Sequence, residues 1–140
     1  MISIRNAESD HDIARCYAVM RQLRPHLRKA DFVATVRRQM NGGYTLAFVE
    51  EDAEIRSVAG YRIIENLFNG RILYVDDLVS DEVHRSRGHG RRLFDWLVVR
   101  AREEGCATLE LDSGVQRSGA HRFYFANGMV ISSFHFRLTL

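Results

Sequence analysis

The sequence predicts an α/β fold in which one mixed β-sheet is flanked by helices. Three observations support this prediction. Asn69-Gly70 separates two apolar alternating stretches, which is a strong signal for the turn of a β-hairpin. In residues 90–104, apolar side chains recur every three or four positions, the period of an amphipathic helix. The second half of the chain orders its segments as strand, loop, helix, strand, helix and strand, which is typical of a sheet covered by helices.

The individual elements follow from local signals along the chain. Ser9 is expected to cap a first helix, whose apolar positions recur as far as Leu27. Asp31 is expected to cap a second helix that stops at Asn41-Gly42-Gly43. Two later helices are expected at residues 90–104 and 119–126. Strands are expected at residues 2–5, 44–50, 55–65, 71–79, 106–111 and 129–140.

Length and composition place the chain among ordinary globular proteins. Its 140 residues are 46% apolar and 27% charged, with a formal net charge of +2, and they predict one domain over residues 1–140. No apolar run approaches the ~20 residues that span a bilayer, and residues 1–6 do not begin a secretory signal. Cys16 and Cys106 lie in apolar contexts and are expected to stay reduced. We therefore expect a cytoplasmic protein without a membrane partner.

The most distinctive segment is a basic, glycine-bearing loop that leads into the helix at residues 90–104. Gly88 and Gly90 allow successive backbone N–H groups to converge, because glycine has no Cβ to block positive φ or close approach. The following helix adds its unpaired N–H groups and the positive end of its dipole. Guanidinium groups suited to phosphate oxygens come from four arginines, namely Arg85, Arg87, Arg91 and Arg92. These features predict an anion site, with a pyrophosphate as the favoured ligand.

Two other phosphate-binding motifs do not fit this loop. A dinucleotide fingerprint would need a third glycine where Leu93 stands. A P-loop would need the triplet Gly-Lys-Ser/Thr, which does not occur in the sequence. The loop pattern that remains is Arg85-x-x-Gly88-x-Gly90.

Two acidic residues, Asp76 and Asp77, lie near the end of the predicted strand that precedes the loop. A carboxylate at this position can accept a proton from an amine, directly or through water. Adjacent strand residues normally point to opposite faces, so at most one of the two is expected to face a given cleft, although a β-bulge would change this. The sequence leaves open which of them is functional, and a solvated strand end explains either one equally well.

Two blocks of the sequence resemble the GCN5-related N-acetyltransferase (GNAT) family. The first is the loop pattern above, and the second is Ala120-x-x-x-Tyr124-x-x-x-Gly128, which fills the family's pattern Ala-x-x-x-Tyr-x-x-x-Gly. The resemblance implies a mixed, mostly antiparallel central sheet of six to seven strands flanked by about four helices. It also implies that acetyl-coenzyme A (acetyl-CoA) is the co-substrate and that a primary amine attacks it directly.

The same resemblance implies roles for particular residues. Tyr124 is expected to protonate the departing thiolate, and Asp76, Asp77 or a water that they hold is expected to take the proton of the amine. Arg117 stands where relatives often carry asparagine, and an arginine there can still reach a phosphate. The backbone around the acetyl group and the pyrophosphate loop are matched by Leu78, Val79, Ser80, Arg85, Ser86, Arg87, Gly88, His89, Gly90 and Arg91.

The acceptor and the partners are less closely defined. The C-terminal half is similar to small-molecule amine acetyltransferases such as aminoalkylphosphonate N-acetyltransferases, which favours a small amine. A protein or peptide N-acetyltransferase and a non-catalytic CoA-binding sensor are the alternatives. The histidines lack the spacing of a metal site, so no metal is expected. The arginines lack the aromatic interleaving of a nucleic-acid surface, so no nucleic acid is expected. A homodimer is possible because dimers are common among relatives.

Overall fold

The computed structural model describes residues 1–140. By their internal contacts these residues form two compact units, Met1–Glu110 and Leu111–Leu140. The expectation of one domain over the whole chain stays a prediction. No helix is long and apolar enough to cross a membrane.

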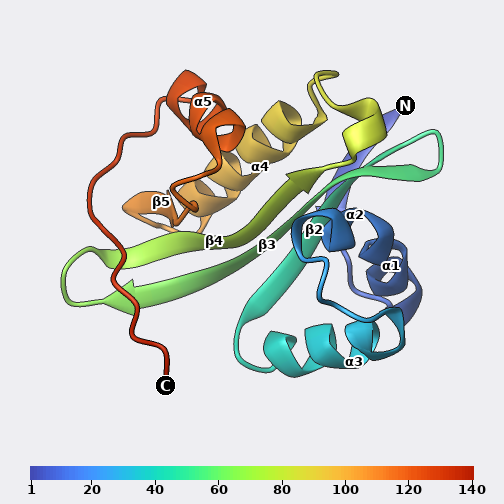
Figure 1. Cartoon of the computed structure of the whole chain (residues 1–140), viewed down its shortest axis with the longest axis horizontal. Coiled ribbons are helices and arrows are strands. Elements are labelled where there is room, and N and C mark those ends of the chain that lie inside the picture. The colour runs from blue at the N-terminus through green and yellow to red at the C-terminus, as the bar shows by residue number, and fades with distance from the viewer. The chain divides into compact units, whose positions relative to one another are not determined.

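The first unit is built on a sheet whose strands lie side by side in chain order (Figure 1). The first four strands pair antiparallel, and short turns join the second to the third and the third to the fourth. The strands are β1 (Ile2–Asn6), β2 (Tyr44–Glu51), β3 (Glu54–Asn66), β4 (Gly70–Ser80) and β5 (Thr108–Leu111). The alternation and turn signals in the sequence therefore predicted these strands to within one or two residues at most of their ends.

Helices cover both faces of this sheet (Figure 1). Leu46 and Phe48 of β2 point to the face where they form a buried cluster with residues of α1 (Asp10–Arg15), α2 (Tyr17–Leu23) and α3 (Lys29–Met40). The other face is covered by α4 (His89–Glu103). On that face Trp96 of α4 makes an edge contact with Tyr61 of β3, with 6.3 Å between the ring centroids. Both faces of the central strands thus carry buried apolar side chains.

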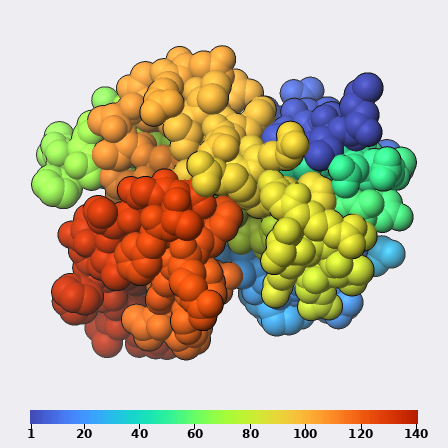
Figure 2. Space-filling model, turned by 90° about the horizontal axis from the view of Figure 1, so that it is seen from above, coloured from blue at the N-terminus to red at the C-terminus, as the bar shows by residue number.

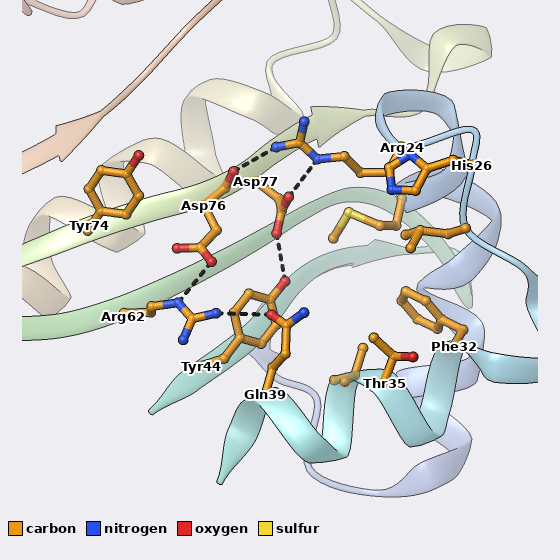
Figure 3. Close-up of a pocket in the computed structure, with 13 residues that line it drawn as sticks. Arg24, His26, Phe32, Thr35, Gln39, Tyr44, Arg62, Tyr74, Asp76 and Asp77 are labelled. Atoms are coloured by element: carbon orange, nitrogen blue, oxygen red, sulfur yellow. Dashed lines mark hydrogen bonds and ion pairs between the residues drawn. The ribbon is translucent and has the colours of Figure 1, made fainter. Parts of the chain in front are cut away.

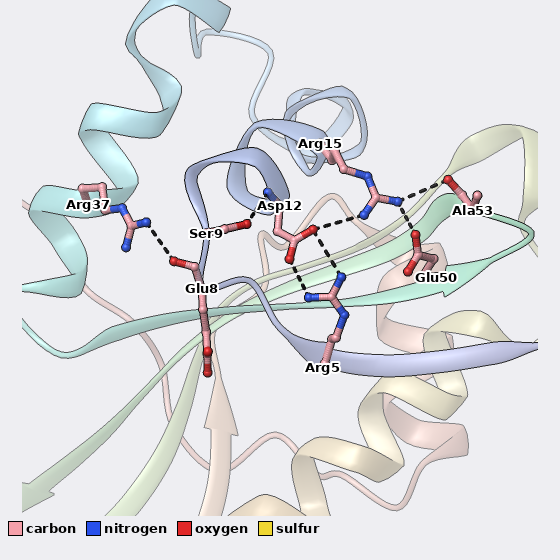
Figure 4. A network of polar contacts seen from close by, with 8 residues as sticks. All are labelled: Arg5, Glu8, Ser9, Asp12, Arg15, Arg37, Glu50 and Ala53. Carbon is pink, nitrogen blue, oxygen red and sulfur yellow. Dashed lines mark hydrogen bonds and ion pairs between the residues drawn. The ribbon is translucent and has the colours of Figure 1, made fainter.

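A polar network fastens α1 to the sheet (Figure 4). Ser9 caps α1 as predicted, because its Oγ accepts a hydrogen bond from the Asp12 backbone N–H at 3.1 Å. The Asp12 carboxylate accepts from Arg5 of β1 at 2.5 Å and from Arg15 at 3.2 Å. Arg15 also donates to Glu50 of β2. One buried carboxylate therefore links β1, α1 and β2.

The first two predicted helices differ from the observed ones. The first is interrupted at Cys16, which ends α1 and begins α2. The second is not capped by Asp31: α3 begins at Lys29 after Arg28, whose backbone is extended, and the Asp31 N–H already bonds to the Arg28 carbonyl at 3.1 Å. Asp31 thus lies in the first turn of α3, where a negative charge interacts favourably with the helix dipole without capping it.

The second unit contains α5 (Ser118–Ala126), within one residue of the prediction. The helix ends as expected at Asn127-Gly128, where Gly128 adopts a φ of +84° and the Met129 N–H bonds to the Tyr124 carbonyl at 3.0 Å. Residues 129–140 form neither helix nor strand, so the predicted last strand is wrong. Phe134 and Phe136 alternate with polar residues as in a strand, but no neighbouring strand pairs with this segment.

The fold class predicted from the sequence is confirmed, and the number of elements is corrected. The sheet has five strands rather than six to seven, and there are five α-helices rather than about four. One short 3₁₀ helix, η1 (Glu82–His84), follows β4. The strand count differs because of residues 129–140, and the helix count differs because the first predicted helix is divided at Cys16.

Candidate active site

A cavity of about 490 Å³ opens on the face of the first unit that carries α2 and α3 (Figure 3). One wall is formed by β3 and β4, and the other by α2, α3 and the segment between them. The lining side chains are Met20, Arg24, His26, Leu27, Phe32, Thr35, Val36, Gln39, Tyr44, Arg62, Tyr74, Asp76 and Asp77. The two aspartates singled out in the sequence are therefore both in this cavity.

A β-bulge in β4 brings the two carboxylates to the same side. Asp77 lies opposite Gly60 of β3, whereas Val75 lies opposite Tyr61, so Asp76 is an extra residue with no partner in the register. An extra residue interrupts the alternation of faces at that point. The expectation that at most one of the two faces a given cleft is therefore wrong, and the reason is the bulge that alternation alone does not reveal.

Asp77 has partners for both of its carboxylate oxygens (Figure 3). Arg24 donates from Nε to Asp77 Oδ1 at 2.9 Å, and the Tyr44 hydroxyl donates to Asp77 Oδ2 at 2.8 Å. Arg24 also donates from Nη2 to the backbone carbonyl of Asp76 at 2.9 Å. Asp77 is thus held between α2, β2 and β4.

Asp76 has a partner for only one of its oxygens. Arg62 of β3 donates from Nε to Asp76 Oδ2 at 2.9 Å, and its Nη2 donates to Gln39 of α3 at 3.0 Å. Asp76 Oδ1 is buried and accepts no hydrogen bond. Burial raises the pKa of Asp76 above its usual value, with the hydrogen bond and charge of Arg62 acting in the opposite direction. The cavity therefore contains one buried oxygen with a free acceptor position and an increased proton affinity.

Tyr44 reaches Asp77 only because residue 60 is glycine. A Cβ added at Gly60 would lie 1.8 Å from the Tyr44 hydroxyl oxygen, so any side chain there would displace the ring. Burial raises the pKa of Tyr44 well above its usual value, and the Asp77 carboxylate raises it further. Tyr44 is therefore a neutral hydrogen-bond donor to Asp77.

The wall opposite the aspartates is mainly apolar, and its polar residues are His26, Thr35 and Gln39. Phe32 of α3 packs edge-on against Tyr17, with 5.3 Å between ring centroids, and presents part of its surface to the cavity. Thr35 lies on the same wall one turn further along α3 (Figure 3). The other apolar side chains of this wall are Met20, Leu27 and Val36.

The predicted anion loop is exposed and leads into α4, as Figure 2 shows by the yellow atoms at the surface. Gly88 precedes the helix in the left-handed region, with a φ of +85°, and no atom lies near the position of an added Cβ. Arg85 and Arg87 are exposed, whereas Arg91 is paired with Asp95 at 3.2 Å on α4. Positive φ at Gly88, free guanidinium groups and the start of a fifteen-residue helix fit a diphosphate.

His89 differs from the other residues of the loop. Its side chain is only 2% exposed, and Nε2 lies 3.2 Å from a carboxylate oxygen of Glu51 at the end of β2. This contact attaches the start of α4 to the β2–β3 hairpin. His89 therefore contributes to the position of the loop, and its side chain does not point to the exposed arginines.

The residues expected beside the acetyl group follow the bulge directly. Leu78 and Val79 pair with Ala59 and Val58 of β3 in regular register. The Ser57 hydroxyl donates to the Val79 carbonyl at 3.0 Å and lies 3.2 Å from the Ser80 hydroxyl. This part of β4 is thus fixed by both backbone and side-chain bonds.

Tyr124 and Arg117 belong to the second unit. Tyr124 is half-buried on α5, and its ring contacts that of Phe123, with 5.8 Å between centroids. Arg117 is the residue before α5, and its side chain makes no capping hydrogen bond. Their expected roles stay predictions.

Sequence reasoning did not single out the three side chains that bond to the two aspartates. Arg24 is the residue after α2, and Tyr44 and Arg62 lie on β2 and β3. Each contacts a residue on another element. No local motif marks these residues, because each contacts an aspartate that is far away in the sequence and close only in the fold. Gly60 is the one local clue in the sequence, because a glycine inside a strand often marks the close approach of another group, here the Tyr44 ring.

Comparisons with known proteins agree with the two sequence blocks. The sequence model of the Acetyltransferase (GNAT) family matches residues 10–129. A protein of Bacillus subtilis (strain 168), named as the uncharacterized N-acetyltransferase YhdJ, is 32% identical over 142 residues, which cover 98% of each chain.

Solved structures share the fold at lower sequence identity. A transcriptional regulator from Bacillus halodurans C-125 matches with a TM-score of 0.87 and 20% identity over 100% of both chains. The aminoglycoside N-acetyltransferase AAC(6')-Iy in complex with CoA matches with a TM-score of 0.87 and 14% identity, over 100% of this chain and 95% of the other.

Proposed function

We propose that this chain, which belongs to the GNAT family of acetyltransferases, transfers an acetyl group to the primary amine of a small molecule. The acetyl donor of the family is acetyl-CoA, which supplies the acetyl group as a reactive thioester.

The observation that carries this proposal is the free acceptor position of Asp76 Oδ1. A buried carboxylate oxygen with no donor and an increased proton affinity suits a group that receives a proton from an ammonium. We therefore assign Asp76 as the base. Asp77 positions the site, because both of its oxygens are already held by Arg24 and Tyr44.

The remaining steps follow from the residues along β4 and the loop. Backbone groups of Leu78 and Val79 orient the acetyl group, and the loop from Arg85 to Gly90 binds the diphosphate of the donor. Ser80, Arg91 and Arg117 support donor binding. The side chain of His89 holds the loop through Glu51.

Asp76 and Tyr124 together account for the protons of the reaction. As the amine nitrogen bonds to the acetyl carbon, the C–S bond breaks and a thiol leaves. The ammonium loses two protons in total. One passes through Asp76 to solvent, and the other replaces the proton that Tyr124 gives to the sulfur.

The size of the cavity favours a small acceptor over a peptide. Its volume of about 490 Å³ lies within the ~300–1,000 Å³ that small-molecule sites typically occupy. A peptide acceptor would instead need an extended groove along the strand edge or surface.

The test is an acetyl-transfer assay in which thiol release is followed with a panel of amines. The panel contains alkylamines, polyamines, aminoalkylphosphonates, amino acids, aminoglycosides and short peptides. We expect turnover with at least one small amine and its loss in Asp76→Asn. Turnover with peptides alone would favour the protein acetyltransferase, and tight CoA binding without any turnover would favour the sensor.

A further inference from the structure

The acceptor cavity combines one charged wall with one apolar wall. The charged wall comes from β3 and β4 and the end of α2, and it carries two carboxylates and two guanidinium groups. The apolar wall comes from α2 and α3 and the segment between them, where Leu27 and Phe32 line the cavity and His26 is an exposed polar residue. The chemistry of the two walls limits the amines that fit between them.

The charges on the first wall already balance one another. Arg24 pairs with Asp77 at 2.9 Å, and Arg62 pairs with Asp76 at 2.9 Å. The charge of each guanidinium is already paired with a carboxylate, so an anionic substituent would gain less from it than from an unpaired arginine. An acceptor with a carboxylate or phosphonate would have to compete with these aspartates.

The wall offers one position for a cation. Asp76 Oδ1 is the only buried aspartate oxygen of the cavity that accepts no hydrogen bond. A second ammonium on the acceptor would find no free carboxylate on this wall, and Arg24 and Arg62 would repel it there because like charges repel.

We propose that the acceptor is a monocationic primary amine with an apolar body. This inference rests on the proposed function. The ammonium lies at Asp76 Oδ1, and the hydrocarbon or aromatic body packs toward α3, against Leu27, Phe32 and the methyl group of Thr35. Amines with a second charge at the far end are disfavoured, because Leu27, Phe32 and Thr35 offer that charge no ionic partner.

The experiment compares three amines that differ only in their far end. Pentylamine, 1,4-diaminobutane and 5-aminopentanoate share a primary amine and a four-carbon chain, and they end in a methyl, an ammonium and a carboxylate. We expect kcat/KM for pentylamine to exceed both others by at least about tenfold, since a small apolar contact alone discriminates by this much. Calorimetric titration of the protein with the same amines should give the same order of affinity.

A charge placed on the apolar wall should reverse the preference. Thr35→Asp puts a carboxylate on the cavity side of α3, so 1,4-diaminobutane should gain on pentylamine by at least about tenfold. The matched control is Ala34→Asp, which adds the same charge to an exposed position of α3 outside the cavity lining. This control should keep the preference of the unchanged protein.

The outcomes separate this inference from the proposed function. Equal kcat/KM for the three amines, or a preference for 1,4-diaminobutane or 5-aminopentanoate, overturns the inference while the small-amine acetyltransferase stands. Failure of all three amines alongside turnover of a peptide overturns both. A switch in preference that Ala34→Asp shares equally with Thr35→Asp also overturns the inference, because it would reflect general charge rather than the wall.

Discussion

At the scale of single residues, Asp76 and Asp77 are adjacent and chemically identical, yet their surroundings differ. Asp77 is held by Arg24 and Tyr44 on both oxygens, whereas Asp76 keeps one buried oxygen without a donor. A carboxylate with all its positions filled is well placed to orient neighbours. A carboxylate with an empty buried position is well placed to accept a proton, and this difference is the reason we propose Asp76 rather than Asp77 as the base.

Asp76→Asn should lower the activity of the protein without lowering its stability. We expect kcat to fall by about 10²–10⁴, the usual contribution of a general base. Because the folded-state pKa of Asp76 is raised, its ionised form opposes folding above the unfolded pKa of ~3.9, so removing the charge should not lower the unfolding midpoint at pH 7. Steady-state kinetics and thermal denaturation at pH 7 measure the two effects.

The matched control is Asp77→Asn. This variant loses the charge that holds Arg24 and the acceptor that Tyr44 uses, so its unfolding midpoint should fall at pH 7 while kcat falls less than in Asp76→Asn. The opposite ranking in kcat would identify Asp77 as the base.

At the scale of elements, the bulge in β4 and the glycine in β3 together form the charged wall. The bulge turns Asp76 and Asp77 to one side, and Gly60 opposite Asp77 leaves room for the Tyr44 ring. The contact between Tyr44 and Asp77 needs both the bulge and the glycine, because a side chain at position 60 would push the Tyr44 ring away from the Asp77 carboxylate.

Gly60→Ala should therefore destabilise the fold through one identified contact. The added Cβ would meet the Tyr44 hydroxyl oxygen at 1.8 Å, and overpacking of this kind costs about 1–3 kcal/mol in the free energy of unfolding. Urea denaturation measures the loss. When Gly60→Ala is made in the Tyr44→Ala variant, the loss in free energy of unfolding should be much smaller, because the ring that the added Cβ meets is then absent. Equal losses in both backgrounds would show that the strain arises elsewhere.

The carboxylate of Asp12 should make the attachment of α1 dependent on pH. The hydrogen bond from Arg5 holds the pKa of Asp12 below its usual value, with burial opposing it and Arg15 assisting. Its contribution to stability is therefore present above the unfolded pKa of ~3.9 and is lost as pH falls through the lower folded-state pKa. Asp12→Asn should destabilise the protein by about 1–3 kcal/mol at pH 7 and by much less near pH 3.

Denaturation curves at the two pH values test this prediction. Asp10→Asn is a suitable control, because Asp10 pairs with Arg37 at an exposed position of the same helix. A loss in Asp12→Asn that is equally large near pH 3 would contradict the assignment.

At the scale of the whole molecule, the sequence predicted what depends on neighbours along the chain. The hairpin at Asn69-Gly70, the helix after Gly88 and the cap at Ser9 are each determined by a few adjacent residues, and the structure contains all three. The bulge at Asp76 and the contacts of Arg24 and Arg62 depend on pairing between distant segments, which local patterns do not encode. Residues 129–140 show the same limit, because an alternating pattern becomes a strand only beside a partner.

The distribution of charge over the whole molecule determines how it attracts acetyl-CoA. The net charge of +2 is small, so attraction of a polyanionic donor must come from arginines gathered at one place. Arg85 and Arg87 are exposed before α4, whereas Arg102 is exposed near the other end of the same helix. We expect the acetyl-CoA KM to rise with salt, because an ionic strength of 1 M shortens the Debye length to ~3 Å.

Replacing the loop arginines should both weaken donor binding and remove this salt dependence. Arg85→Gln and Arg87→Gln should each raise the acetyl-CoA KM by about tenfold at low salt, since a hydrogen bond to a charged group contributes ~1.5 kcal/mol or more. Their KM should then change less with salt than that of the unchanged protein. Arg102→Gln removes the same charge from the molecule but lies outside the loop, so its KM and salt dependence should stay unchanged. If Arg102→Gln behaved like the loop variants, overall charge rather than the loop would attract the donor.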